Sequence, residues 1–268
     1  MTQHAAAKSS STPPLVRQTE DGGVVTVTLN RPEARNALSR GLMSALQETF
    51  ETIGASSART VILAGEGPAF CAGHDLKEIR SDPRAQTYEA LFAQCSRLMQ
   101  TIVALPQPVI ARVHGPASAA GCQLVATCDL AIAGTSARFA TPGVNIGLFC
   151  STPMVALSRN VSSKHAMEML LTGDMYDAPE AVRMGLVNRA VADHELVDAV
   201  DTLARKIATK SATTIKIGKQ AFYLQQEMDL AAAYDYASRV MTENMLTRDA
   251  EEGIDAFIEK RPPQWENP

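Results

Sequence analysis

The sequence predicts an α/β core followed by a wholly helical C-terminal region. As far as about residue 193, short runs of β-branched and other apolar residues alternate with longer segments whose apolar residues recur every three or four positions. Beyond Asp193 the strand pattern vanishes and only the helical period remains. Because strands that alternate with helices are typical of α/β proteins, we expect an α/β core over residues 15–193 and a helical region over residues 194–268.

The first elements of the core have clear boundaries. Val24–Leu29 alternates as a strand does, and Pro32 ends it. Ser39 is placed to cap a helix that runs to about Ile53. Thr60–Ala64 is a nearly continuous apolar run, which is typical of a strand covered on both faces.

The middle of the chain repeats this organisation. Tyr88–Leu105 is amphipathic and predicts a helix, and Val109–Val113 predicts a second buried strand. A turn of small residues, His114–Ala120, then leads into a short helix over Gly121–Cys128. Leu130–Ala133 predicts another strand, so the alternation of strands and helices continues.

Helices account for most of the remaining chain. Two are expected at about residues 164–171 and 179–184, ended by Gly173 and Gly185 as glycine C-caps predict. Four more are expected at about 194–210, 212–226, 229–246 and 249–260.

The first residues, 1–14, read MTQHAAAKSSSTPP and differ from the rest in composition. They are rich in serine and contain no acidic residue, which predicts a disordered tail. A remnant of an organelle-targeting peptide is the alternative, but such peptides are usually rich in arginine and this segment has one lysine.

Composition argues against several classes of protein. The chain has 268 residues and a net charge of −4, with no basic stripe that would favour a nucleic-acid partner. No segment approaches the roughly 20 apolar residues of a membrane span. The five cysteines have no C-x-x-C spacing and are interpreted as reduced intracellular thiols. No metal site is expected, because the following histidines show no ligand spacing: His4, His114, His165 and His194.

Two loops share one form, an apolar segment followed by small residues and a helix start. They are FCAGHDLKE at 70–78 and HGPASAAGCQLV at 114–125. Small side chains leave backbone N–H groups uncovered, and a helix N-terminus adds a positive dipole end. Two such loops that face each other would hold one carbonyl oxygen between two donors. The alternative is that the small residues serve close packing alone.

Four segments carry a family resemblance: LNRPEARNAL, FCAGHDLKEI, PVIARVHGPASAAGCQLVATCDLAIA and LTGDMYDAPEAVRMGLVNRAV. They resemble the successive signatures of the enoyl-CoA hydratase/isomerase (crotonase) superfamily, from about Val24 to Arg261. The resemblance implies a spiral of ββα units, a helical region used for trimerisation, and commonly a dimer of trimers. It also implies a coenzyme A thioester as substrate or ligand in acyl-CoA metabolism, with no permanently bound cofactor. A bacterial source would imply the cytoplasm, and an animal source the mitochondrion.

The resemblance also implies site residues. The two oxyanion donors of the family map onto the backbone N–H groups of His74 and Ala120, although the family usually has glycine at the second position. Lys260 is expected to reach the nucleotide from a neighbouring subunit. The residues expected to hold coenzyme A in the chain itself are Arg31, Arg35, Asp75, Leu76 and Lys77. A solvated surface charge is the alternative for each of the basic residues, and a structural role is the alternative for Asp75.

Hydratases of the family use two glutamates, and both are absent here. The first position maps onto Gln123 and the second onto Gly143. An amide orients water but accepts no proton at neutral pH. Because a positioned acid or base typically contributes about 10²–10⁴-fold, standard hydratase activity is expected to be weak or absent.

Other residues near the acyl end offer no evident replacement. Some isomerases and dehalogenases of the superfamily have an aspartate at a position that maps onto Ser151, which is no base. Cys150 would need a base partner to act as a nucleophile, and none is identifiable, so a buried thiol is favoured.

Three functions therefore remain open from the sequence. The chain is a hydratase-like enzyme with weak turnover, a decarboxylase of a malonyl-type thioester, or a non-catalytic acyl-CoA binder. The sequence AGHD around His74 resembles methylmalonyl-CoA decarboxylases of the superfamily, and Gln123 would tolerate a substrate carboxylate that glutamate would repel. Those decarboxylases have tyrosine where Cys150 aligns, which weakens the second reading.

Overall fold

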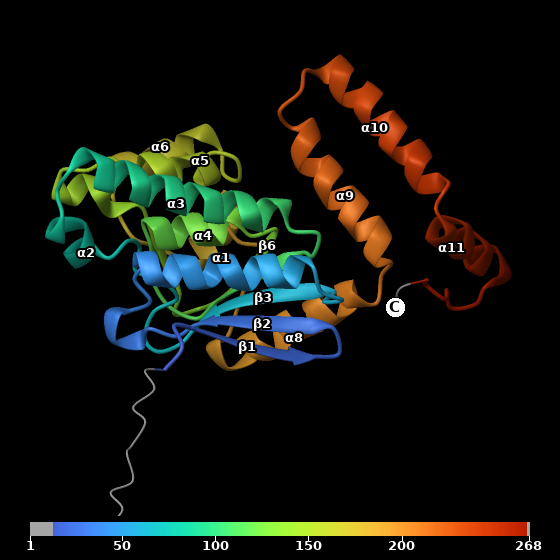
Figure 1. Ribbon diagram of the computed structural model, residues 1–268, viewed down its shortest axis with the longest axis horizontal. Helices are drawn as coiled ribbons and strands as arrows, with labels where there is room; N and C mark the ends of the chain where they lie inside the picture. Colours follow the sequence, from blue (N-terminus) through green and yellow to red (C-terminus); the bar gives the residue numbers. More distant parts are fainter. Residues whose placement is uncertain (1–12, 267–268) are drawn as a thin grey trace, which may run out of the picture.

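A computed structural model describes residues 13–266, and it confirms the α/β class (Figure 1). The main sheet has six strands in the order β1-β2-β3-β4-β6-β9, all parallel except β1, which pairs antiparallel with β2. Its strands are β1 Val16–Asp21, β2 Val24–Leu29, β3 Thr60–Gly65, β4 Val109–Val113, β6 Leu130–Gly134 and β9 Arg189–Val191.

A smaller sheet stands beside the main one and shapes the central loops. It has the order β5-β7-β8, with β5 parallel to β7 and β8 antiparallel to it. Its strands are β5 Ala117–Ser118, β7 Arg138–Ala140 and β8 Tyr176–Asp177. Because β5 immediately precedes a helix, this small sheet fixes where that helix begins.

Eleven α-helices lie in the described part of the chain. Those up to residue 184 are α1 Arg40–Gly54, α2 Leu76–Ser81, α3 Ala85–Ala104, α4 Ala120–Thr127, α5 Ser151–Leu157, α6 Ser163–Thr172 and α7 Ala178–Met184. The last four are α8 Leu196–Ala208, α9 Ala212–Gln225, α10 Leu230–Met245 and α11 Arg248–Glu259. Short 3-10 turns lie at Pro32–Ala34, Pro142–Ile146 and Asp193–Glu195.

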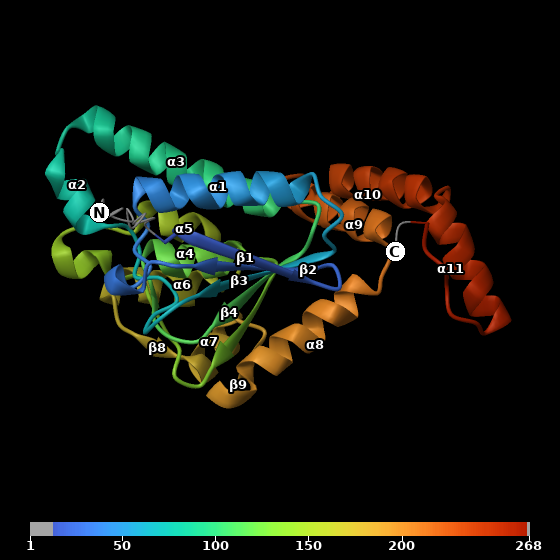
Figure 2. The ribbon, with the colours of Figure 1, turned by 60° about the horizontal axis from the view of Figure 1, so that its bottom comes forward.

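Helices cover both faces of the main sheet. Figure 2 shows α1 and α3 on one side of the strands and α8 on the other. On the α8 side, alternate strand residues such as Ile62 and Ile110 pack with Leu196 and Val200. The opposite side forms the larger core, in which Phe50 of α1 and Leu98 of α3 are fully buried. Residues of β3 are buried on both faces, as the apolar run predicts.

The last three helices form an arm that leaves the core (Figure 1). α9, α10 and α11 bury few side chains within the chain, whereas α8 belongs to the layer on the sheet. Large apolar side chains of the arm are exposed: Phe222, Leu224, Met228, Leu230, Tyr234, Met241, Met245, Leu246, Ile254, Phe257 and Ile258. Among residues 13–266, no helix combines the length and apolar character that a bilayer span requires.

Most of the predicted elements are confirmed, with small shifts of their ends. Ser39 caps α1 by accepting a hydrogen bond from the Leu42 N–H, and Gly173 and Gly185 end α6 and α7 with φ of 67° and 88°. Four features were not predicted from the sequence: β1, β9, α5 and the small sheet. The predicted disordered tail, 1–14, lies outside the described residues except for its last two.

Candidate functional site

The loop after β3, residues 70–78, lies between the segment that contains Leu38 and strand β5. Leu38 pairs with it on one side, where the Leu38 N–H donates to the Gly73 carbonyl and the Asp75 N–H donates to the Leu38 carbonyl. On the other side Cys71 pairs with Ala117 of β5. The two loops of similar form are therefore joined directly.

Two backbone N–H groups at this junction, those of His74 and Ala120, have no acceptor among the described residues. The pairing with Leu38 uses the groups of the residues on either side of His74, so the His74 N–H faces away from Leu38. The Ala120 N–H begins α4, where no intrahelical acceptor exists. Among residues 13–266, neither N–H donates to an acceptor.

Close packing keeps these two donors near each other. A Cβ on Gly73, whose φ is +93°, would lie 3.3 Å from the Ala120 nitrogen and 2.9 Å from the Ser118 oxygen. A Cβ on Gly121 would lie only 2.0 Å from the Cys71 oxygen. Glycine at both positions therefore lets the first loop touch the start of α4.

Ala119 has a strained backbone at the same place. Its φ of 50° and ψ of −117° are unusual for a residue with a side chain, and such conformations cost of order 1–3 kcal/mol. Ala119 makes no side-chain cap to α4. This strain turns the chain sharply from β5 into the helix, and it leaves the Ala120 N–H uncovered.

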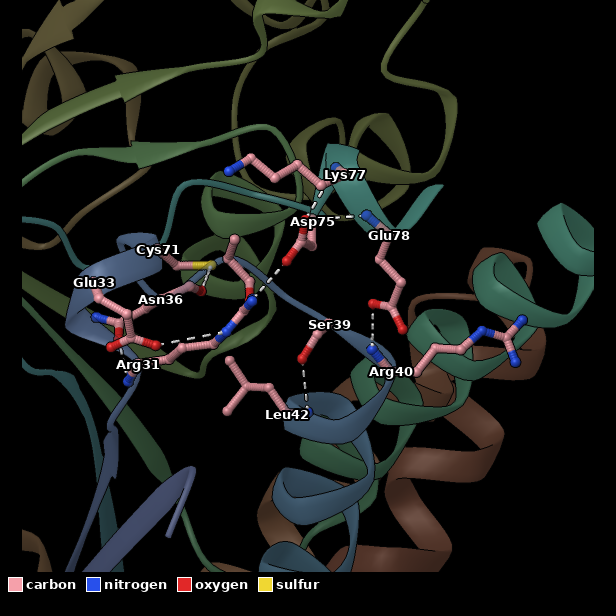
Figure 3. Close-up of polar contacts among 11 residues, drawn as sticks. Arg31, Glu33, Asn36, Ser39, Arg40, Leu42, Cys71, Asp75, Lys77 and Glu78 are labelled. Carbon is pink, nitrogen blue, oxygen red and sulfur yellow. Dashed lines mark hydrogen bonds and ion pairs between the residues drawn. The ribbon is translucent and has the colours of Figure 1, made fainter. Parts of the chain in front are cut away.

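Asp75 holds the far end of the first loop (Figure 3). One carboxylate oxygen caps α2 by accepting hydrogen bonds from the Lys77 and Glu78 N–H groups, and the other lies 2.8 Å from a guanidinium nitrogen of Arg31. Burial acts to raise the pKa of Asp75, but these hydrogen bonds and the Arg31 charge outweigh it and hold the pKa below its usual value. These contacts fit the structural alternative for Asp75.

α2 is also tied to α1. The Glu78 carboxylate accepts a hydrogen bond of 2.9 Å from the Arg40 N–H, as Figure 3 shows. Arg31 in turn donates to the Ala37 carbonyl at 3.0 Å and is thus engaged within the chain. Both contacts limit how far the first loop can move.

The imidazole of His74 has no hydrogen-bond partner among the described residues, and both ring nitrogens are sealed from solvent. Its ring meets Phe92 of α3 edge to face, with centroids 5.7 Å apart. Burial lowers the pKa of His74. The side chain is therefore a neutral group that packs beneath α3, while its backbone carries the unpaired donor.

Gln123 lies one turn into α4 and is 4% exposed. Its side-chain oxygen lies 4.0 Å from the Cys95 sulfur, and its side-chain nitrogen donates to no acceptor among residues 13–266. The position thus offers an N–H donor and no base.

Gly143 lies in a position where a side chain has no room. A Cβ built on it would lie 2.6 Å from the Leu148 oxygen and 2.9 Å from the Cys150 sulfur. The Leu148 N–H donates to the Gly143 carbonyl at 2.9 Å and closes this loop on itself. A glutamate here would require residues 148–150 to move.

Cys150 is a buried thiol next to Gly143, and Ser151 is exposed at the start of α5. Burial raises the pKa of Cys150, which keeps the thiol protonated. Burial likewise raises the pKa of Cys95 and of Cys122 to about 12. These thiols are poor nucleophiles, in line with the packing role favoured from the sequence.

The predicted coenzyme A residues fall into three groups, of which the first is the ion pair of Arg31 and Asp75 described above. Arg35, Leu76 and Lys77 are exposed near the first loop, and the side chains of Arg35 and Lys77 make no hydrogen bond or ion pair with another described residue. Lys260 ends α11, which lies at the opposite end of the molecule from α2 in both ribbon views (Figures 1 and 2). Within a single chain, Lys260 therefore lies far from Arg35, Leu76 and Lys77.

Gly73, Ala119 and Gly121 were not predicted from the sequence as site residues. The crowding of small residues in both loops was the signal available for them. Nothing in the sequence indicates that the Leu148 carbonyl occupies the space beside Gly143. Within residues 13–266, no three residues of His, Cys, Asp or Glu gather as a metal site would require.

Comparisons with known proteins identify the family and the fold. The family model described as Enoyl-CoA hydratase/isomerase matches residues 19–268. The chain is 44% identical over 259 residues to the human enoyl-CoA hydratase domain-containing protein 3, mitochondrial, covering 96% of this chain and 85% of that protein.

Two solved structures share the fold. An enoyl-CoA hydratase of Mycobacterium smegmatis superimposes with a TM-score of 0.92 at 54% identity, covering 94% of this chain and 99% of the other. The human domain-containing protein 3 superimposes with a TM-score of 0.90 at 43% identity, covering 94% of this chain and all of the other, 100%. These matches confirm the crotonase fold that the resemblance implies, and the chain belongs to the enoyl-CoA hydratase/isomerase family.

Proposed function

We propose that the protein binds an acyl-CoA thioester and holds its carbonyl oxygen between the backbone N–H groups of His74 and Ala120. The observation that carries this proposal is the pair of unpaired donors on two loops that touch. Preorganised donors of this kind stabilise a developing oxyanion, each by about 3 kcal/mol. Membership of the enoyl-CoA hydratase/isomerase family supports a thioester as the ligand.

We infer that hydration by the two-glutamate mechanism is weak or absent. Gln123 supplies a donor where the resemblance places the first glutamate. Gly143 has neighbours that exclude a side chain where the resemblance places the second. On this proposal the site binds the carbonyl oxygen, and neither Gln123 nor Gly143 supplies a general base.

The exposed Arg35 and Lys77 suit the phosphates of coenzyme A because they are cationic and otherwise unengaged within the described chain. We assign Lys260 to the nucleotide of a neighbouring subunit. No resident cofactor is part of this proposal. The mitochondrial names of the animal relatives support a mitochondrial protein for an animal source, and the cytoplasm is proposed for a bacterial one.

Self-association through the arm is part of the proposal. Many large apolar side chains of the arm are exposed among residues 13–266, which is unusual for a monomer. We propose a homotrimer, with two trimers pairing into a hexamer. Sedimentation velocity of the full chain tests this, and a mass of one chain at micromolar concentration would contradict it.

Two measurements on the purified full chain distinguish binding of a thioester from its turnover. Calorimetric titration with crotonyl-CoA and with free CoA is expected to show tighter binding of the thioester, and loss of crotonyl-CoA is followed in parallel. Wild type is expected to turn over little, and Gln123→Glu is expected to raise hydration because it restores one carboxylate. Absence of thioester binding would overturn the proposal. Rapid wild-type hydration that Gln123→Ala abolishes would show that an amide suffices to organise water.

A second candidate is decarboxylation of a malonyl-type thioester. The unpaired side-chain nitrogen of Gln123 favours a ligand with an acceptor such as a carboxylate. Loss of carbon dioxide leaves an enolate that the two backbone donors would stabilise. Release of carbon dioxide from malonyl-CoA or methylmalonyl-CoA, lost in Gln123→Leu, would support this candidate. No release from either would leave the role of a non-catalytic binder.

A further inference from the structure

Asp129 lies two residues beyond α4 and fastens that end of the helix. Its Oδ2 accepts hydrogen bonds of 2.7 Å from the Val109 N–H and 2.7 Å from Lys219 Nζ, and its Oδ1 accepts one of 2.9 Å from the Tyr223 hydroxyl. Both carboxylate oxygens are thus engaged, and the side chain is 15% exposed. Two of these partners belong to α9, the first helix of the arm.

Lys219 uses all its donors at this junction. Besides Asp129, its ammonium donates to the Ile102 carbonyl at 3.1 Å and to the Gln107 carbonyl at 3.0 Å. An ammonium has three N–H donors, so none is left unpaired. The side chain is 6% exposed. One residue of the arm therefore binds the end of α3, the loop before β4 and the turn that follows α4.

The helices fastened in this way are the helices of the site. α4 begins with Ala120 and carries Gln123 one turn later, and every residue of it is buried. α3 packs against it, where Cys95 contacts Gln123 and the Thr127 hydroxyl lies 3.3 Å from the Met99 sulfur. Because α4 has only eight residues, displacement of its C-terminal end is expected to move its first N–H as well.

We propose that Lys219 is a positioning residue for the thioester site: through Asp129 it holds α4 so that the Ala120 N–H stays beside the His74 N–H. The inference rests on the proposed function, since it concerns the donors that receive the thioester carbonyl. It also joins the site to the arm, because Lys219 lies on α9.

The choice of variants follows from the burial of the pair. Removing Lys219 alone leaves a carboxylate buried without a counter-charge, which is strongly destabilising. The test therefore uses Lys219→Met together with Asp129→Asn, which removes both charges and keeps side chains of similar length. The control is Lys216→Met, because Lys216 lies on the same helix, is exposed and makes no hydrogen bond or ion pair among the described residues.

The readout is the carbonyl stretch of crotonyl-CoA labelled with ¹³C at the thioester carbon, measured by infrared difference spectroscopy on the folded full chain. Hydrogen bonds from both donors are expected to lower this frequency in wild type and in Lys216→Met. In the double variant most of the shift is expected to disappear. Its affinity for crotonyl-CoA is expected to fall about tenfold while its affinity for free CoA stays within about twofold, because free CoA has no thioester carbonyl.

Two outcomes would overturn the inference. A folded double variant that keeps the carbonyl shift and the preference for thioester over free CoA would show that Lys219 is merely structural. An unshifted carbonyl in wild type would remove the proposed function and this inference with it. Equal losses of thioester and free CoA affinity would also contradict a specific effect on the carbonyl donors.

Discussion

The candidate site has two backbone donors and two positions where the family has acid–base side chains. The packing around these two parts of the site differs. Around the His74 and Ala120 N–H groups, glycines and a strained Ala119 leave the donors open and close together. Around Gln123 and Gly143, the neighbours leave no base and, at Gly143, no room for one. The donors proposed for a carbonyl oxygen are thus backbone groups, whereas Gln123 and Gly143 contribute no side chain that accepts a proton at neutral pH.

This difference determines how the donor pair and the acid–base positions are expected to respond to substitution. Backbone donors survive substitution of their own side chains, so they are sensitive chiefly to the packing that sets the distance between the loops. Acid–base positions depend on the side chain itself and on the space around it. Single substitutions are therefore expected to damage the donor pair through glycines and to restore proton transfer only incompletely.

The largest expected effect comes from Gly121→Ala. The added Cβ would lie 2.0 Å from the Cys71 oxygen, which is backbone and cannot swing away. We expect the free energy of unfolding to fall by about 3 kcal/mol, as overpacking in a buried site does, and thioester affinity to fall because the two loops separate. Urea denaturation and calorimetric titration measure both quantities.

The control for this variant is Gly218→Ala on α9, where a Cβ has no neighbour within 4 Å. Alanine in a helix interior is expected to raise the free energy of unfolding by up to about 1 kcal/mol. Similar stability of the two variants would mean that the contact between the loops tolerates a methyl group.

Gly143→Ala tests whether the space beside Gly143 excludes a side chain. Its Cβ would lie 2.6 Å from the Leu148 oxygen, so the loop that contains Leu148 and Cys150 must move. We expect a loss of about 2 kcal/mol in the free energy of unfolding, measured by urea denaturation, with thioester affinity less affected than in Gly121→Ala. A fully stable variant would show that this loop yields easily and that a glutamate could be accommodated.

Asp75→Asn is expected to have the smallest effect and a characteristic pH dependence. The variant loses the charge that pairs with Arg31 but keeps an oxygen that can cap α2, so we expect a loss of about 1 kcal/mol at neutral pH. The pKa of Asp75 is lowered in the folded chain, so this stabilisation is present above the unfolded value of about 4 and disappears as the pH falls through the lowered pKa.

The measurement for this variant is urea denaturation at about pH 7 and about pH 3, since the difference between wild type and variant should shrink at the lower pH. Asp174→Asn, at an exposed position between α6 and β8, serves as the control. A difference that is the same at both pH values would mean that the Asp75 charge does not stabilise the first loop.

Much of the fold could be predicted because local chemistry and tertiary packing agree. Ser39 caps α1, and Gly173 takes the left-handed conformation that ends α6. β1 was missed because VRQTED is almost wholly exposed and shows no apolar alternation. α5 was missed because its Ser-Thr-Pro start gives a weak helical signal, and the strands of the small sheet are only two or three residues long.

The site was predicted less completely, and for a physical reason. Residue type and family resemblance point to His74, Ala120 and Gln123, because both depend only on which residue stands at each position. The contact of Gly143 with the Leu148 carbonyl and the sealing of the His74 ring depend on segments folded against one another. Such contacts have no local pattern in the sequence.

The exposed edge strand β1 has a consequence for how the protein stays in solution. A sheet edge offers free backbone groups to any other chain, and unprotected edges promote aggregation. β1 carries Arg17, Glu20 and Asp21 on its exposed residues, so a foreign strand that paired there would meet charge of both signs. The self-association proposed for the apolar arm therefore does not require the main sheet, at this edge, to be open as a template for fibres.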